Sequence, residues 1–277
     1  MTRTTSSLAP TLIRPPGWLG GLDVAELWAY RELLYFLVWR DIKVRYKQTV
    51  IGVGWALIQP FGTMVVFSLF FGGLARMPSD GLPYPIFFYA ALVPWTYFAT
   101  AVQGATNVML EHQRVITKVY FPRVLLPLAA VLSGLVDFAI AGTLLLAMAL
   151  WYGIVPTTAI VTLPLFVALA VAAALGVGLW LSALNVMYRD VRYVLPFLIQ
   201  FWMFVSPVAY PSSLVPERWR WLYGLNPMAG VVEAFRGAFG GAPAVAVVGA
   251  SVVATALVLI GGLFFFQSVE GTLVDLA

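Results

Sequence analysis

The chain has 277 residues, of which 61% are hydrophobic and only 10% are charged. Soluble domains carry about 25% charged residues, so this composition excludes a soluble protein and predicts an all-α protein that crosses a membrane several times. With no cysteine and a single histidine, His112, the chain can hold neither a disulfide framework nor a metal site of thiolates or several imidazoles. The net charge of +4 is scattered between apolar stretches, which favours contact with anionic lipid and argues against binding of nucleic acid.

Two different segments precede the first long apolar stretch. Residues 1–30 are polar, contain three prolines and lack the apolar run and cleavage site of a signal peptide, so we expect a cytoplasmic tail. In residues 31–49, the side chains of Tyr35, Trp39 and Tyr46 fall on one face of a helix, with basic residues on either side of that face. This pattern predicts an amphipathic helix that lies in the membrane interface.

The second of these segments leaves two details open. Asp41 and Arg45 are four residues apart, a spacing at which acidic and basic side chains can pair on a helix. Residues 42–47 also alternate in the manner of a β-strand. We favour the helix because the apolar stripe extends back to Tyr35 and no turn residue interrupts it.

Six apolar stretches can serve as transmembrane helices. They are residues 50–75, 85–110, 124–152, 159–184, 193–210 and 243–266. In the fourth stretch, small residues four apart, such as Ala172 and Gly176, would let another helix approach closely. Residues 211–241 are too charged to face lipid and too aromatic for a plain loop. We therefore expect two short re-entrant helices there, separated at Asn226 and Pro227.

The basic residues set the orientation of these spans. With the N-terminus in the cytoplasm, the inner segments hold twelve Lys and Arg residues and the outer segments hold four. The positive-inside rule therefore places both termini in the cytoplasm.

Sequence motifs for catalysis are missing from the chain. It contains no G-x-x-x-x-G-K-[ST] phosphate loop, so we expect it not to bind or hydrolyse ATP by itself. It also has neither H-E-x-x-H nor G-x-S-x-G, so an intramembrane protease or esterase is not supported. We predict a protein that is not an enzyme by itself, without a cofactor of its own, and any ATP-driven transport would need a separate subunit.

Several motifs in a fixed order resemble those of the ABC-2-type permeases that export bacterial polysaccharides. They are RDIKVRYKQT at 40–49 followed by Gly52, Trp55 and Pro60, NVMYRDV at 185–191, SPVAYP at 206–211, and LNPM at 225–228 followed by EAFR at 233–236. The match leaves out the tail before about residue 30 and makes residues 50–277 the transmembrane domain. The most similar family members are permease subunits for O-antigen, capsule and teichoic-acid export.

The resemblance implies a half-transporter in the bacterial cytoplasmic (inner) membrane. Two copies would form the pathway, and two ATP-binding cassette subunits would bind ATP and Mg²⁺ on the cytoplasmic side. The cargo in this family is a glycan carried on a polyprenyl diphosphate. Alternatives are an ABC-2 permease for drugs or lipids, a proton-coupled secondary transporter, and a membrane-embedded glycosyltransferase. A single deep carboxylate argues against the secondary transporter, and the lack of a paired acidic motif in a cytoplasmic loop argues against the transferase.

Two groups of charged residues are candidate sites on the cytoplasmic side. Basic residues of the interfacial helix could position the diphosphate, because guanidinium and ammonium groups suit phosphate, and anchoring to anionic lipid is an equal alternative. These are Arg40, Lys43, Arg45 and Lys47. The charged loop after the second span is the candidate contact with the ATPase, against an ordinary basic loop as the alternative. Its residues are Glu111, His112, Arg114, Lys118 and Tyr120.

Three further sets complete the candidates. Aromatic side chains could stack on sugar rings along the pathway, and we select Trp55, Phe67, Trp202 and Tyr210. Asp137 lies mid-span, where a lone carboxylate costs about 2.5–3.5 kcal/mol, so we expect a structural pair with Gln103 or Asn107 more than a proton relay. Charged residues between spans five and six could form an outer gate, with a solvated loop as the alternative; they are Arg218, Arg220, Glu233 and Arg236, the last two spaced to pair.

Overall fold

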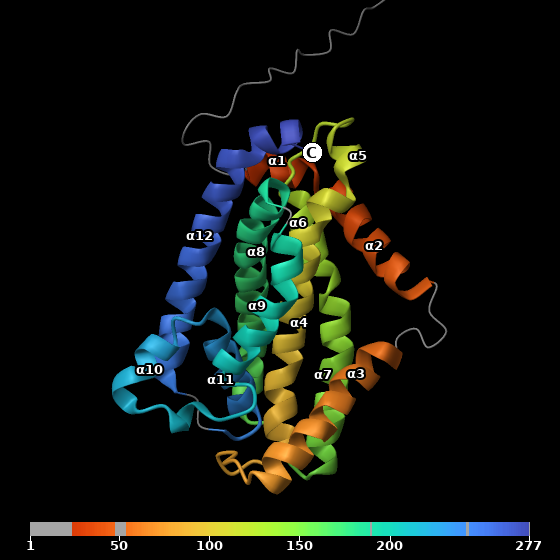
Figure 1. The fold of residues 1–277 in the computed structure, drawn as a ribbon. Coiled ribbons are helices and arrows are strands. Elements are labelled where there is room, and N and C mark those ends of the chain that lie inside the picture. Colours follow the sequence, from red (N-terminus) through yellow and green to blue (C-terminus); the bar gives the residue numbers. More distant parts are fainter. Residues whose placement is uncertain (1–23, 48–53, 189, 242–243, 277) are drawn as a thin grey trace, which may run out of the picture.

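The fold is a bundle of helices (Figure 1), given by a computed structural model that describes residues 24–47, 54–188, 190–241 and 244–276. Within these ranges there is no β-strand, so the predicted all-α class is confirmed for the described chain. The α-helices are α1 (Val24–Ala29), α2 (Arg31–Lys47), α3 (Gly54–Phe67), α4 (Tyr84–Glu111), α5 (Gln113–Ile116), α6 (Leu125–Ser133), α7 (Leu135–Trp151), α8 (Leu163–Met187), α9 (Val191–Val205), α10 (Glu217–Tyr223), α11 (Pro227–Ala238) and α12 (Val245–Leu276). A π-helix, η1 (Ser68–Leu74), continues α3, and two 3₁₀ turns are η2 (Thr158–Thr162) and η3 (Ser212–Leu214).

Five helical segments of the described chain are long and apolar enough to cross a membrane. They are Gly54–Leu74, Tyr84–Glu111, Leu125–Trp151, Thr158–Met187 and Val245–Glu270. These segments match five of the six predicted spans to within a few residues, which confirms a multi-pass membrane protein. The helix in the remaining span, α9, has only 15 residues, or about 22 Å at 1.5 Å per residue, and falls short of the roughly 20 residues that a span needs. Six spans therefore stay a prediction.

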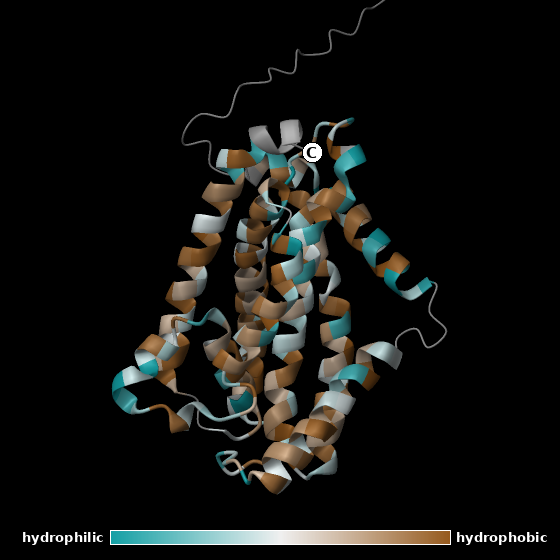
Figure 2. Ribbon diagram, in the orientation of Figure 1, coloured by the Kyte–Doolittle hydropathy of each residue, from teal (hydrophilic) through white to brown (hydrophobic). Residues whose placement is uncertain are grey.

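Helix α4 is the centre of the bundle. Its first turns carry a run of bulky side chains that are almost entirely inaccessible, including Ile86, Phe87, Phe88 and Tyr89. A helix that is apolar on all sides is expected to be surrounded by other helices. In agreement, α4 packs against α8, α6, α7, α11 and α3. Figure 2 shows hydrophobic residues along the length of the bundle, with hydrophilic residues concentrated toward its ends and along α2.

The small residues of α8 allow the close helix contacts that their spacing predicts. A side chain at Gly176 would place its Cβ 2.8 Å from the backbone of Leu259 in α12, closer than real Cβ contacts. On the other side, a Cβ at Gly178 would lie 2.6 Å from that of Ala105 in α4. Helix α8 is therefore held between α12 and α4, and the prediction of close packing is confirmed.

The segment before the first span is helical, so the strand alternative for residues 42–47 is wrong. Helix α2 packs on α6, with Leu37 buried between them, and leaves Tyr35 and Trp39 exposed on its outer face. In Figure 1 it starts at the end of the bundle where the C-terminus lies and slopes away beside it. Its place in a membrane interface stays a prediction. Most of the predicted tail, residues 1–23, lies outside the described residues.

Two short helices lie between α9 and α12, as predicted. Helix α11 begins at Pro227, and the side chain of Asn226 accepts a hydrogen bond from the backbone N–H of Met228 at 3.1 Å. Asparagine at the N-cap followed by proline at the first helical position is a strong helix-start signal, which explains the break between α10 and α11. Re-entry of these helices into a membrane stays a prediction.

Candidate functional site

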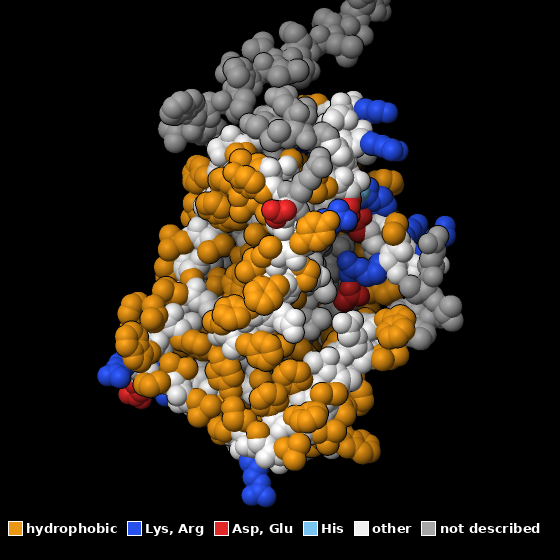
Figure 3. Space-filling view, viewed as in Figure 1, with side chains coloured by type: hydrophobic (Ala, Val, Ile, Leu, Met, Phe, Trp, Pro, Cys, Tyr) orange, Lys and Arg blue, Asp and Glu red, His pale blue; other side chains and the backbone are white. Residues whose placement is uncertain are grey.

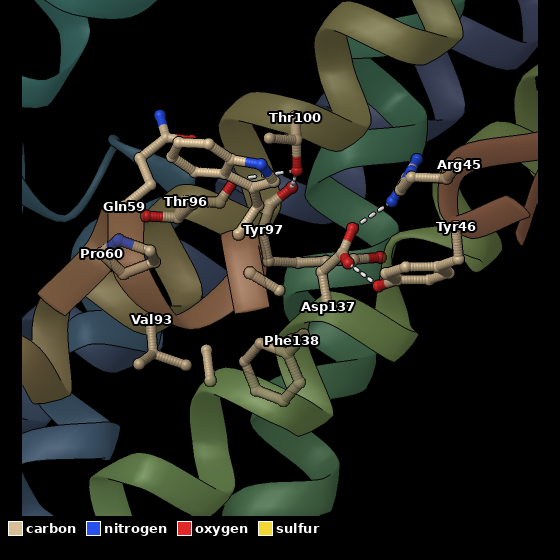
Figure 4. A pocket seen from close by; sticks show the side chains of 13 residues that line it. Arg45, Tyr46, Gln59, Pro60, Val93, Thr96, Tyr97, Thr100, Asp137 and Phe138 are labelled. Atoms are coloured by element: carbon tan, nitrogen blue, oxygen red, sulfur yellow. Dashed lines mark hydrogen bonds and ion pairs between the residues drawn. The ribbon is translucent and has the colours of Figure 1, made fainter. Parts of the chain in front are cut away.

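A cavity of about 390 Å³ lies between α2, α3, α4 and α7, and it is the candidate site (Figure 4). Its polar lining comes from all four helices and consists of Arg45, Tyr46, Gln59, Thr96, Tyr97, Thr100 and Asp137. Apolar residues, among them Trp55, Val93 and Phe138, make up most of the remaining wall. A cavity of this kind, apolar with a few convergent polar groups, is typical of a ligand site.

Three side chains meet at one edge of this cavity. Arg45 forms an ion pair with one carboxylate oxygen of Asp137, and the Tyr46 hydroxyl donates a hydrogen bond to the other oxygen (Figure 4). Two consecutive residues of α2 thus bind the same carboxylate of α7. Asp137 lies in the first turn of α7.

This arrangement corrects two predictions. Asp137 pairs neither with Gln103 nor with Asn107, since the Asn107 amide instead donates to the Gln103 carbonyl and its side-chain oxygen accepts from Asn185. Arg45 does not pair with its i−4 neighbour, because the Asp41 carboxylate accepts hydrogen bonds from Arg40, the residue next to it, at 2.8 and 3.0 Å. Local spacing permitted both predicted pairs, but α2 packs on α6, and the side chains of its last turn reach Asp137 of α7 instead.

The Tyr46 hydroxyl is fixed as a donor. Burial, together with the hydrogen bond to Asp137 and that residue's negative charge, raises the pKa of Tyr46 to about 12. At physiological pH the phenol therefore keeps its proton and can offer it to an anion. The Arg45 guanidinium beside it is always charged. Their side chains meet Asp137 in a half-exposed position, with 41% of the Arg45 side chain and 29% of the Asp137 side chain accessible.

A second cavity, of about 410 Å³, lies next to the first, between α2, α4 and α6. Arg45 lines both cavities, and the second is also lined by Arg40, Asp41, Glu111 and His112. The structure therefore brings two of the predicted diphosphate-binding residues beside two of the predicted ATPase-contact residues. The other two basic residues of α2 lie on its exposed surface: Lys43, with its ammonium 5.2 Å from the ring centroid of Trp39, and Lys47.

Only one of the four selected pathway aromatics lines the candidate cavity. Trp55 lies in its wall with about half of its surface exposed. Phe67 stacks on Phe88 of α4, with ring centroids 4.7 Å apart. Trp202 donates its indole N–H to the side chain of Asn226 at 3.1 Å and lines a separate, almost entirely apolar cavity of about 450 Å³ beside α8 and α12.

Tyr210, the last of these aromatics, bonds to Tyr223 through the two hydroxyls, 2.8 Å apart. Contacts with other residues of this chain thus engage the remaining three selected aromatics, Phe67, Trp202 and Tyr210. Sequence reasoning missed the cavity's polar groups in spans one and two, Gln59, Thr96 and Thr100. Two threonines four residues apart in an apolar helix were the available signal, since that spacing places them on one face.

The loop after α4 carries charged side chains that are exposed on the protein surface. Ile116 and Phe121 are buried and fix the loop. Arg114 and Lys118 are exposed. Figure 1 places α5 at the same end of the bundle as α1 and the C-terminus, and Figure 3 shows Lys and Arg side chains gathered over α5 and α2, with mainly hydrophobic side chains over the rest of that face.

The other three candidates of this loop differ in exposure. Glu111 is exposed, and Tyr120 is exposed with its hydroxyl 3.5 Å from Glu26. His112 is half-buried, with its ring Nδ1 3.0 Å from the Val108 carbonyl oxygen. His112 therefore caps the end of α4, and Glu111 and Tyr120 are open to a partner together with the two basic residues.

The predicted outer-gate residues fall into two groups. Glu233 and Arg236 pair across one turn of α11 at 3.8 Å, as predicted, and both side chains are about 95% buried. Arg218 and Arg220 lie on α10, where Arg220 pairs with Glu217 at 3.6 Å and Arg218 lies over the ring of Trp219. In the part of the chain that the structure describes, no ion pair joins the two groups.

Arg236 is held inside the protein by several backbone groups. It donates hydrogen bonds to the carbonyl oxygens of Val208 at 2.8 Å, Phe87 at 3.2 Å and Tyr210 at 3.3 Å, and its guanidinium carbon lies 3.5 Å from the ring centroid of Phe87. Burial lowers the pKa of Arg236 to about 10, so the guanidinium stays charged at neutral pH. Arg236 therefore ties α11 to α4 and to the segment after α9.

Comparisons with known proteins agree with this architecture. A family model described as ABC-2 type transporter matches residues 32–240. The O-antigen export system permease protein RfbA of Myxococcus xanthus is 32% identical over 219 residues, which cover 78% of this chain and 83% of the relative. A Klebsiella pneumoniae protein of the same name is 26% identical over 75% of this chain and 80% of its own length. The polysialic acid transport protein KpsM of Escherichia coli is 24% identical over 71% and 77%, respectively.

Proposed function

We propose that this chain, which belongs to the ABC-2 type transporter family, is the membrane subunit of a polysaccharide exporter and receives the anionic end of a lipid-linked glycan at Arg45. The names of relatives that match more than 70% of the chain, O-antigen export permeases and a polysialic acid transport protein, support the class of cargo. The observation that carries the site is a half-exposed guanidinium in the wall of a 390 Å³ cavity, beside the exposed ring of Trp55.

The chemistry of this cavity suits a diphosphate attached to a sugar and a polyprenyl chain. Arg45 can donate two hydrogen bonds to phosphate oxygens, and Tyr46 offers a third. Trp55 presents an aromatic face on which a sugar ring can stack. The polyprenyl chain would stay in the lipid, next to the exposed apolar side chains of α2, such as Tyr35 and Trp39.

The energy for transport would come from partner subunits. We propose that two copies of this chain form the pathway and that two ATP-binding cassette subunits bind ATP and Mg²⁺, with the exposed loop at Arg114 and Lys118 as their docking surface. We further propose that the protein lies in the bacterial cytoplasmic membrane with both termini in the cytoplasm, and the distribution of Lys and Arg supports this orientation.

The test is transport in vesicles that contain the chain and its ATPase partner. We expect ATP-dependent movement of a polyprenyl-diphosphate-linked glycan, and we expect Arg45→Gln to reduce it by about tenfold or more, since hydrogen bonds to charged groups contribute about 1.5–3 kcal/mol. The matched control is Arg31→Gln, which removes the same charge from the exposed start of α2. Equal transport by both variants, or movement of drug-like or phospholipid probes in place of the glycan, would contradict the proposal.

The docking surface needs a separate experiment. The double variant Arg114→Glu/Lys118→Glu should lose co-purification with the ATPase, because it reverses two exposed charges at the proposed contact. Arg218→Glu reverses an exposed charge on α10, at the other end of the bundle, and should leave the complex intact. Retention of the ATPase by the double variant would remove the loop from the interface.

A further inference from the structure

We infer that Asp137 is an internal stand-in for the cargo's phosphate: it binds Arg45 and Tyr46 until a diphosphate headgroup displaces it, and its displacement releases the end of α2 from α7. This inference rests on the proposed function in one respect, namely that the displacing anion is the diphosphate of a lipid-linked glycan. It assigns to Asp137 the role of a positioning residue that competes with the cargo for the same two donors.

The geometry of the Asp137 site is that of an occupied anion site. One carboxylate oxygen accepts from the Arg45 guanidinium and the other accepts from the Tyr46 hydroxyl. The oxygens of a phosphate group are hydrogen-bond acceptors and carry negative charge, as those of a carboxylate do. A phosphate can therefore accept both hydrogen bonds in place of Asp137. Among the described residues, Asp137 is the one acidic side chain that pairs with Arg45, because the carboxylate of Asp41 is bonded to Arg40.

The position of the pair makes exchange feasible. Both side chains are half-exposed and line the 390 Å³ cavity, so an incoming anion can approach Arg45 without first being enclosed in the apolar interior. Ion pairs at this level of exposure are weak, since solvent already stabilises the separated charges. A headgroup carrying more negative charge than one carboxylate therefore competes effectively for the same guanidinium.

Displacement of Asp137 would have a mechanical consequence. Arg45 and Asp137 are 92 residues apart in sequence, and their contact joins the last turns of α2 to the first turn of α7. The middle of α2 is held separately by the buried side chain of Leu37 and by packing on α6. Loss of the Asp137 contact would thus free the end of α2 that leads to α3, while the middle stays attached.

The experiment measures binding to the complete transporter, with its ATPase, in nanodiscs of zwitterionic lipid. The probe is a polyprenyl diphosphate without glycan. Because the competing carboxylate loses its charge, Asp137→Asn should bind the probe about two- to fivefold more tightly than the unaltered protein, whereas Arg45→Gln should bind it more weakly. In the Arg45→Gln background, Asp137→Asn should have no further effect, since the competition requires Arg45. Glu32→Gln removes an exposed carboxylate from the start of α2 and is the matched control.

A distance measurement tests the release of α2. The chain has no cysteine, so Val44→Cys and Ala139→Cys introduce a unique pair of labelling sites on exposed positions of α2 and α7, outside the predicted diphosphate-binding residues. With spin labels at these sites, we expect the distance distribution to lengthen when the probe is added. When Asp137→Asn is added to the labelled protein, the distance between the labels should already be longer without the probe.

The outcomes separate this inference from the proposed function. If the unaltered protein binds the probe but Asp137→Asn binds it equally or more weakly, Asp137 is only a structural anchor and the inference fails alone. If the unaltered protein does not bind the probe, both fail. If phosphatidylglycerol or inorganic pyrophosphate displaces Asp137 as well as the probe does, the anion is a membrane lipid or any phosphate, and a stand-in specific for the cargo is overturned.

Discussion

Two arginine–carboxylate pairs lie in different parts of the molecule, and they differ in nearly every physical respect. Arg236 and Glu233 are about 95% buried in α11, and Arg236 also donates to three backbone carbonyl groups. Arg45 and Asp137 join two helices at the wall of a cavity and are half-exposed. The same pair of functional groups is thus enclosed by the protein at one place and accessible from a cavity at the other.

The cost of removing charges from water explains the difference. A buried guanidinium must have all of its donors satisfied, and once it is satisfied, no ligand can compete without unfolding its surroundings. A half-exposed pair gains little from its contact, because water stabilises the separated ions almost as well. We therefore expect the first pair to determine stability and the second to respond to ligands.

The largest expected effect is that of Arg236→Gln. Removal of one partner leaves Glu233 as an uncompensated buried charge and leaves three carbonyl groups without their donor, so the free energy of unfolding should fall by about 3–5 kcal/mol. Chemical unfolding of the protein in detergent measures this change. Arg218→Gln, at an exposed position on α10, is the control and should change stability by less than about 0.5 kcal/mol. Equal stability of the two variants would contradict a stabilising role for the buried Arg236–Glu233 pair.

A smaller loss is expected for Asn226→Ala, which tests the same structural region. The Asn226 side chain caps α11, accepts from Trp202 and donates to Ser206 at 2.8 Å. Its removal should lower the free energy of unfolding by about 1–2 kcal/mol, as loss of an N-cap does. Asn226→Asp keeps the capping oxygen and should recover most of the loss. No difference between the two variants would show that the cap contributes little.

Tyr46→Phe should cost about 0.5–1.5 kcal/mol, the contribution of one hydrogen bond. The pKa of Tyr46 is raised from 10.0 to about 12, so the protonated phenol is favoured in the folded state. Its contribution to stability is therefore fully present below pH 10 and is lost only as the pH rises through about 12. The stability difference between Tyr46→Phe and the unaltered protein should be the same at neutral pH and at about pH 9. A difference that already shrinks by pH 9 would contradict the raised pKa.

The smallest change in stability is expected for Arg45→Gln, at less than about 1 kcal/mol, because its ion pair is half-exposed. This variant distinguishes a role in transport from a role in stability, since its loss of transport should far exceed its loss of stability. Parallel unfolding and transport measurements on Arg45→Gln and Arg236→Gln would show whether the two arginines separate in this way. If Arg45→Gln lowered the free energy of unfolding by several kcal/mol, both arginine–carboxylate pairs would be needed for stability.

Features that depend on neighbouring residues of the chain could be predicted from the sequence. Hydropathy located the five helices of the described chain that are long and apolar enough to cross a membrane, and the Asn226–Pro227 pair marked the start of α11. Spacing along one helix predicted the contact between Glu233 and Arg236 and the close approach at Gly176. These predictions hold because helix periodicity, capping and apolar length are local properties of the chain.

Contacts between side chains of different helices could not be predicted in this way. The spacing along α2 permitted a pair between Arg45 and Asp41, whereas in the folded protein Arg45 pairs with Asp137 of α7. Similarly, Trp55 lines the candidate cavity, while Trp202 is engaged by Asn226. A helical wheel fixes the direction of a side chain relative to its own helix. The partner that the side chain reaches depends on how separate helices pack, and no local pattern contains that information.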